Sequence, residues 1–102
     1  MLASFSVLPI GVGEELKAHV AKILALVDES GLDYKLGAMQ TTVEGDPDAV
    51  MALIMKCHRL MREIAPRVLT SITIDDREGA QCRLAGKVKD VEDVLKRDLS
   101  HE

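Results

Sequence analysis

A strand that leads directly into a helix is the feature of this sequence that most constrains its fold. Residues 39–45, Met-Gln-Thr-Thr-Val-Glu-Gly, combine β-favouring residues with hydroxyls and one carboxylate. Asp46 then suits the N-cap of a helix, and Pro47 suits its first position. The junction therefore predicts a small α+β domain in which a strand with one polar face passes into a helix.

Length and composition predict one domain, spanning residues 1–102, with enough apolar residues to form a core. The hydrophobic share of 47% is high for a monomer of this size, so we expect some apolar surface to be covered in a homo-oligomer. The net charge of −4, with one Phe, one Tyr and no Trp, argues against nucleic-acid binding.

Cysteine spacing and hydropathy predict a cytoplasmic protein. Cys57 and Cys82 form neither a C-x-x-C pair nor a zinc pattern, which fits a reducing compartment. No apolar stretch reaches the length of a membrane span, and no basic leader precedes the domain, so we expect no membrane partner.

Periodicity predicts alternating strands and helices along the rest of the chain. We expect strands at 2–8, 32–37, 39–44 and 67–75, and helices at 14–30, 47–64 and 87–99. Pro9 and Gly11 are expected to end the first strand. The first helix carries one apolar stripe, formed by Leu16, Val20, Ile23, Leu24 and Val27.

This order of elements predicts a ferredoxin-like sandwich. Two right-handed β-α-β crossovers joined through one hairpin give an antiparallel four-stranded sheet of order 4-1-3-2. Both main helices then cover one face of the sheet, and the helix at 87–99 is an extra C-terminal helix.

Strand parity predicts that the other face of the sheet is open and rich in polar side chains. Its polar members are Ser4, Ser6, Gln40, Thr42, Glu44, Ser71 and Thr73. Ser6 is expected within a few ångströms of Thr42 or Glu44 across the two central strands. A polar face is common in antiparallel sheets and needs no function. Leu2, Leu8 and Leu69 share this face, however, so an oligomer interface that closes over a polar centre is the alternative.

No motif in the sequence predicts catalysis, a metal site or a cofactor. G-x-S-x-G, P-loop and G-x-G-x-x-G patterns are absent, and the histidines have no partner at ligand spacing. Cys57 is expected in the core, and His58 on a solvated helix surface beside Arg59 and Arg62. We therefore expect a protein that is not an enzyme.

Several segments, taken in order, resemble the small thiamine-binding protein family. They are Ser-Val-Leu-Pro-Ile-Gly at 6–11, Ser-Gly-Leu-Asp-Tyr at 30–34, Met-Gln-Thr-Thr-Val-Glu-Gly at 39–45, Arg-Val at 67–68 and Ile-Asp-Asp-Arg at 74–77. The resemblance implies a ferredoxin-like fold, self-association as a homodimer or homotetramer, and non-enzymatic binding of thiamine or its hydroxymethylpyrimidine moiety. The chain departs from the family pattern at Gln40, where a glycine is expected within Pro-Met-Gly-Thr.

The resemblance also suggests which residues bind this ligand near a subunit interface. Glu44 is the expected charged anchor, with Ser6 and Thr42 as hydroxyl partners of an aminopyrimidine. Thr41 matches the family threonine, yet parity turns it toward the helices, so either a bulge near residues 39–40 re-aims it or the open-face assignment is off by one there.

Few side chains can cover the ligand ring, because the chain has so few aromatic residues. The candidates are Tyr34, Phe5 and Met39. The alternative to a vitamin-binding protein is a structural or regulatory oligomerisation module that uses the same sheet face and binds no vitamin.

Overall fold

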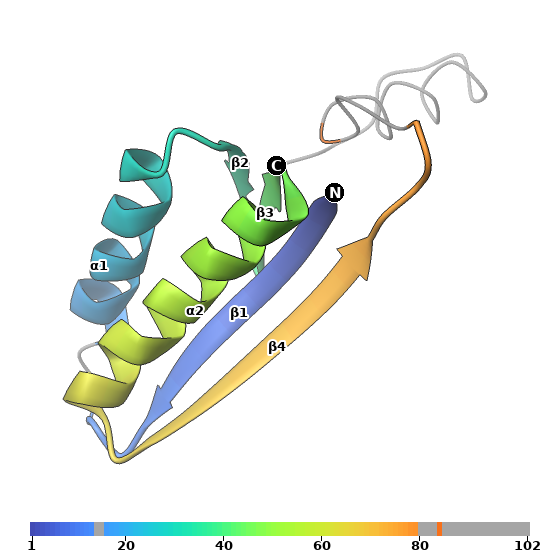
Figure 1. The fold of residues 1–102 in the computed structure, drawn as a ribbon. Coiled ribbons are helices and arrows are strands. Elements are labelled where there is room, and N and C mark those ends of the chain that lie inside the picture. The colour runs from blue at the N-terminus through green and yellow to red at the C-terminus, as the bar shows by residue number, and fades with distance from the viewer. Residues whose placement is uncertain (14–15, 80–83, 85–102) are drawn as a thin grey trace.

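In the computed structural model, placement is described for residues 1–13, 16–79 and 84 (Figure 1). The described elements are β1 (Leu2–Ile10), α1 (Leu16–Glu29), β2 (Asp33–Leu36), β3 (Thr41–Glu44), α2 (Pro47–Ile64) and β4 (Arg67–Asp75). The helix predicted at 87–99 and the cysteine at 82 lie outside the described residues.

The four strands form one antiparallel sheet in the order β2-β3-β1-β4. This is the predicted order 4-1-3-2 counted from the opposite edge. Both helices pack on one face of the sheet and leave the other face open, which makes an α+β fold (Figure 1).

The predicted bounds of α2 and β4 are confirmed. The Asp46 carboxylate accepts hydrogen bonds from the backbone N–H groups of Asp48 and Ala49, at 3.1 and 3.3 Å, and Pro47 occupies the first helical position. Pro66 follows the end of the helix. Asp46, Pro47 and Pro66 mark the two ends of α2, which explains why its bounds could be predicted from the sequence.

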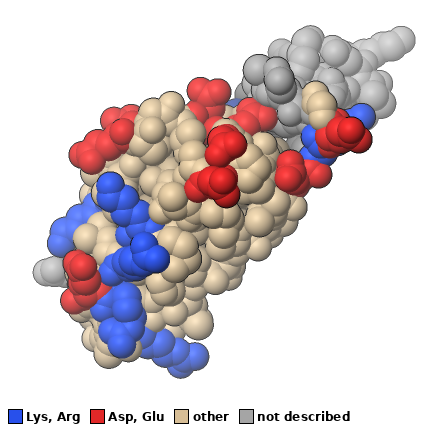
Figure 2. Space-filling view, in the orientation of Figure 1, with Lys and Arg blue, Asp and Glu red and all other residues tan. Residues whose placement is uncertain are grey.

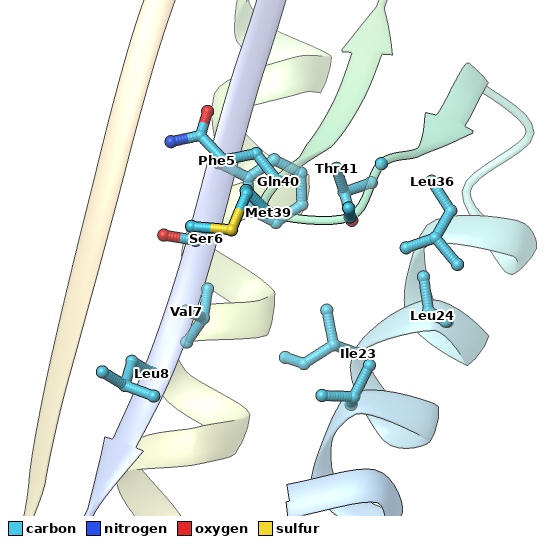
Figure 3. A pocket seen from close by; sticks show the side chains of 13 residues that line it. Phe5, Ser6, Val7, Leu8, Ile23, Leu24, Leu36, Met39, Gln40 and Thr41 are labelled. Atoms are coloured by element: carbon cyan, nitrogen blue, oxygen red, sulfur yellow. The ribbon is translucent and has the colours of Figure 1, made fainter. Parts of the chain in front are cut away.

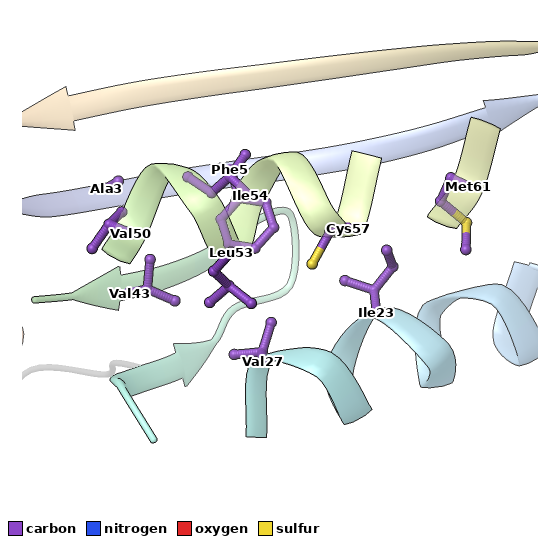
Figure 4. Close-up of a cluster of buried hydrophobic side chains, with 10 residues drawn as sticks. All are labelled: Ala3, Phe5, Ile23, Val27, Val43, Val50, Leu53, Ile54, Cys57 and Met61. Atoms are coloured by element: carbon purple, nitrogen blue, oxygen red, sulfur yellow. The ribbon is translucent and has the colours of Figure 1, made fainter. Parts of the chain in front are cut away.

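The core lies between the sheet and the two helices (Figure 4). Its buried hydrophobic residues are Ala3, Phe5, Ile23, Val27, Val43, Val50, Leu53, Ile54, Cys57 and Met61. They come from the inward positions of the strands and from one face of each helix, as the periodicity predicts.

β1 is longer than predicted, because it continues through Pro9 to Ile10. Pro9 lies opposite Val68 of β4, but β3 accompanies β1 only as far as Phe5. Among the described residues, the second half of β1 therefore has a strand neighbour on one side alone, where a residue without an N–H group is tolerated.

The apolar stripe predicted on α1 is only partly buried. Ile23 and Val27 are in the core, whereas Leu16 is 42% exposed and Val20 49% exposed. The physical reason is the shortness of the β2–β3 hairpin, which has four residues in each strand and provides no sheet beneath the first turns of α1.

Candidate functional site

A gap beside the second half of β1 forms a hollow in the described structure. Because β3 begins at Thr41, opposite Phe5, no described strand pairs with this edge of β1 beyond that point. α1 lies across the gap, and the loop between β2 and β3 closes one end of it (Figure 3).

The hollow is a cavity of about 390 Å³. Its lining comes from residues 5–8 of β1, from Val20, Ile23 and Leu24 of α1, and from residues 36–41 of the hairpin. No charged side chain is among these lining residues. The size falls within the range of roughly 300–1,000 Å³ that is typical of small-molecule sites.

The hairpin tip is regular and contains no bulge. The Gly37 N–H donates to the Gln40 carbonyl at 2.9 Å, so Ala38 and Met39 form a two-residue loop. The Leu36–Thr41 pair continues the same register. Thr41 lies on the helix side of the sheet, as parity alone predicts. Neither a bulge near residues 39–40 nor a shift of the open-face assignment by one residue is therefore needed.

Thr41 is the buried polar residue of the cavity. It is 8% exposed and lies in register between Phe5 and Leu36. Its hydroxyl points toward the cavity (Figure 3). A hydroxyl in largely apolar surroundings can give a bound ligand one specific hydrogen bond.

The predicted site residues fall into two groups, and the first of them lines the cavity. Ser6, Met39 and Thr41 belong to it, together with Gln40. Met39 is 87% exposed at the loop, and strand parity directs the Ser6 side chain toward the open face, so both border the cavity at its rim.

The second group lies on the open face, at the far end of β3. The Thr42 and Ser4 hydroxyls are 2.7 Å apart and share a hydrogen bond. The register thus places Ser4, and not Ser6 as predicted, opposite Thr42. The Glu44 carboxylate accepts a hydrogen bond from the Leu84 N–H at 3.2 Å.

Tyr34 belongs to neither group. It lies opposite Val43, on the helix side of the sheet, and its hydroxyl donates to the Asp28 carboxylate at 3.0 Å. That hydrogen bond, reinforced by the negative charge of Asp28, raises the pKa of the Tyr34 phenol. This contact fastens the edge strand to the end of α1.

Some features of the site were missed from the sequence. Val20 and Leu24, predicted only as members of the apolar stripe of the first helix, line the cavity, and no signal in the sequence distinguishes cavity-lining from core positions. His58, expected on a solvated surface, places Nδ1 2.7 Å from the Thr70 hydroxyl oxygen of β4.

Residues 1–13, 16–79 and 84 contain neither a metal-binding cluster nor a membrane-crossing helix. Among them, no three His, Cys, Asp or Glu side chains are grouped so that they could hold a metal ion. Neither α1 nor α2 combines the length and the hydropathy that a membrane-crossing helix needs.

Comparison with known families identifies the family. Residues 3–92 match the profile of the family described as Thiamine-binding protein. The chain belongs to this family. The UPF0045 protein Mb1933 of Mycobacterium bovis is 39% identical over 98 residues, which cover 95% of this chain and 96% of that protein.

Solved structures share the fold of this family member. The hypothetical protein MJ1052 of Methanocaldococcus jannaschii superposes with a TM-score of 0.81 at 27% identity, over 88% of this chain and 93% of that one. A domain of unknown function, DUF77, from Bacillus cereus gives a TM-score of 0.76 at 31% identity, over 85% of each chain. Membership of the thiamine-binding protein family supports a thiamine-related role with a small-molecule ligand.

Proposed function

We propose that this protein binds thiamine, or its hydroxymethylpyrimidine moiety, without chemical conversion, and that the pyrimidine end occupies the cavity beside β1. The family match supports the class of ligand. The observation that carries the proposed location is Thr41, the buried polar residue that lines a largely apolar hollow.

The lining suits a neutral planar ring. Phe5, Val7 and Ile23 supply apolar contacts, and the Thr41 hydroxyl can both donate to a ring nitrogen and accept from an exocyclic amine. Since no charged residue lines the cavity, the thiazolium cation of thiamine would lie outside it, near the exposed Met39. Gln40 at the rim narrows this entrance compared with the family glycine.

The open face offers a second location, in which Glu44 and Thr42 hold the ligand and a second subunit covers it. Two contacts make this location less favourable. The Ser4 and Thr42 hydroxyls already satisfy each other, and the Glu44 carboxylate already accepts from the Leu84 N–H.

Isothermal titration with thiamine and, separately, with hydroxymethylpyrimidine tests both the ligand and the location. Thr41→Val removes only the hydroxyl in the cavity, and Thr42→Val is the matched control one residue away on the other face. We expect Thr41→Val to weaken binding by about tenfold, the effect of one lost hydrogen bond to a buried group. Thr42→Val and Glu44→Gln should bind as the wild type does.

Two other outcomes of this titration would contradict the proposed location or the proposed function. Weaker binding by Thr42→Val or Glu44→Gln, with Thr41→Val unchanged, would move the ligand to the open face. No heat from either ligand, with a folded wild-type protein, would reject the vitamin-binding function.

The second candidate function is a structural or regulatory assembly module with a ferredoxin-like fold. Its interface would be the open face of the sheet. Leu8 and Leu69 favour it, because they lie opposite each other on the open face and are each 46% exposed. Leu69→Ser should then weaken self-association, whereas a vitamin-binding protein with its site in the cavity should keep its affinity, because Leu69 does not line the cavity. The cytoplasmic location stays a prediction.

A further inference from the structure

The wall that β1 contributes to the cavity is the edge of the strand, and not one of its two faces. Four consecutive residues, 5–8, line the hollow. Phe5 and Val7 belong to the helix side of the sheet, whereas Ser6 and Leu8 belong to the open face (Figure 3). A hollow that touches both sets lies beside the strand, where a ligand can reach the backbone itself.

Hydrogen bonds at the start of β1 show which residues turn their backbone groups toward this edge. The Met1 amine donates to the Gly45 carbonyl at 2.9 Å, and the Gly45 N–H donates to the Met1 carbonyl at 3.0 Å. Two residues that exchange both bonds form a hydrogen-bonded pair of an antiparallel ladder, and such pairs alternate with pairs that exchange none. In the same register, Ala3 and Phe5 therefore turn their N–H and carbonyl groups toward β3.

Val7 is the next residue with this orientation, and β3 does not reach it. The β1–β3 ladder stops at the pair of Phe5 with Thr41, and the backbone hydrogen bonds of the described turns and loops do not include Val7. Toward β4, the ladder bonds of this half of β1 belong to Ser6 and Leu8, because the orientation alternates. The N–H and carbonyl groups of Val7 thus point side by side into the gap.

Pro9 agrees with this orientation. It lies two residues further along β1, so its backbone faces the same way as that of Val7. A proline lacks the N–H group and is tolerated in a strand where that group would not serve the ladder. Since β1 ends at Ile10, the Val7 N–H is the last donor that this strand directs to the side of the cavity.

Few other groups in the hollow can recognise the polar edge of a ring. Lys and Arg side chains gather mainly toward one end of the molecule, and Asp and Glu mainly toward the other (Figure 2). None of them lines the hollow, and the polar side chains that do are Ser6, Gln40 and Thr41. Because Ser6 and Gln40 lie at the rim, the Thr41 hydroxyl and the Val7 backbone are the polar groups left inside.

A donor and an acceptor side by side match one edge of an aminopyrimidine. On that edge the amine can donate to the Val7 carbonyl while the adjacent ring nitrogen accepts from the Val7 N–H. The amine has a second hydrogen and the ring a second nitrogen, which remain for the Thr41 hydroxyl. The oxo form of the ring carries a carbonyl beside a ring N–H. In the same orientation it would place acceptor against acceptor and donor against donor.

We propose that the backbone of Val7 determines the specificity of the cavity: it selects rings with an amine beside an unprotonated ring nitrogen and rejects the corresponding oxo rings. The inference rests on the proposed function, because it requires the pyrimidine end of the ligand to lie in the cavity. Recognition then comes from main-chain groups at a strand edge that no neighbouring strand covers, as it does when an edge binds an extended peptide.

Hydrogen exchange of backbone amides, followed by NMR with and without hydroxymethylpyrimidine, tests the contact directly. In the free protein the Val7 amide should exchange faster than the amides of Ser6 and Leu8, which take part in the β4 ladder. Saturating ligand should slow the exchange of Val7 at least about tenfold more than that of Ser6 and Leu8. These two amides are the control within the same molecule.

Isothermal titration with thiamine and with its oxo analogue, oxythiamine, tests the selectivity. Oxythiamine should bind at least about tenfold more weakly. Val7→Pro removes the N–H group, and Val7→Ala is the matched control for the smaller side chain. We expect Val7→Pro to weaken thiamine binding about tenfold more than Val7→Ala does. Thermal unfolding shows whether Val7→Pro is folded, and if it is not, the exchange measurement on the wild type decides.

The outcomes separate this inference from the proposed function. No binding of thiamine or hydroxymethylpyrimidine to the folded wild type would reject both. Binding that Thr41→Val weakens, with no selective slowing of the Val7 amide or with equal affinity for oxythiamine, would overturn the role of Val7 and leave the vitamin-binding function in place.

Discussion

The Nδ1 atom of His58 lies 2.7 Å from the Thr70 hydroxyl oxygen, so a hydrogen bond joins α2 to the edge strand β4. Both side chains are half-buried. Further along the helix side of β4, Ile72 and Ile74 are 36% and 48% exposed, so this hydrogen bond helps to hold the edge strand against α2.

We predict that this hydrogen bond contributes about 0.5–1.5 kcal/mol to the free energy of unfolding. Thr70→Val and His58→Ala should each lower that free energy, and the double variant should lose less than the sum of the two. Urea denaturation of the four proteins measures the coupling. Additive losses would show that the two side chains act independently.

The Asp46 cap gives a second prediction. Its carboxylate satisfies the N–H groups of Asp48 and Ala49, so Asp46→Ala should lower the free energy of unfolding by about 0.5–2 kcal/mol. Asp46→Asn retains a side-chain oxygen and should lose much less. Thermal and urea unfolding compare the two variants, and equal losses would mean that capping is not the cause.

The Cys57 thiol predicts a pH dependence of stability. Burial raises its pKa from 9.0 to about 11, because the charged thiolate is poorly solvated in the core. The folded protein therefore holds this proton more tightly than the unfolded chain. Its contribution is fully present below pH 9 and is lost as the pH rises toward 11.

Urea denaturation at pH 8.5 and 10.5 tests this dependence against Cys57→Ala, which lacks the thiol. The wild type should lose more stability between the two pH values than the variant does, although the variant starts lower because of the volume it removes from the core. The same loss in both proteins would assign the pH dependence to other groups.

The sequence was sufficient where local signals agree with the fold. Asp46, Pro47 and Pro66 set the bounds of α2, and alternation set the faces of β1 and β3, including the inward position of Thr41. These features depend on neighbours in the chain, which the sequence displays directly.

The cavity could not be predicted, because it depends on how far elements distant in sequence extend beside one another. β3 ends its pairing at Phe5, while β1 continues to Ile10 and α1 still carries its apolar stripe. The register error has the same origin, since β1 and β3 are distant in sequence and no local signal shows that Ser4, and not Ser6, lies opposite Thr42. Periodicity predicts that a side chain faces inward, but it does not predict whether another side chain packs against it.

Val20 provides the most direct test of the cavity, because it lines the hollow from α1 and is nevertheless 49% exposed. Val20→Trp would fill part of the space with an indole while removing no core contact, so the proposed ligand should bind at least about tenfold more weakly. Ala21→Trp adds the same side chain one position away, where the helix faces solvent and not the cavity, and should bind normally. Titration with hydroxymethylpyrimidine, with thermal unfolding of both variants to show intact folding, separates blocked binding from general damage. Equal affinity of Val20→Trp and the wild type would show that the ligand does not occupy the cavity.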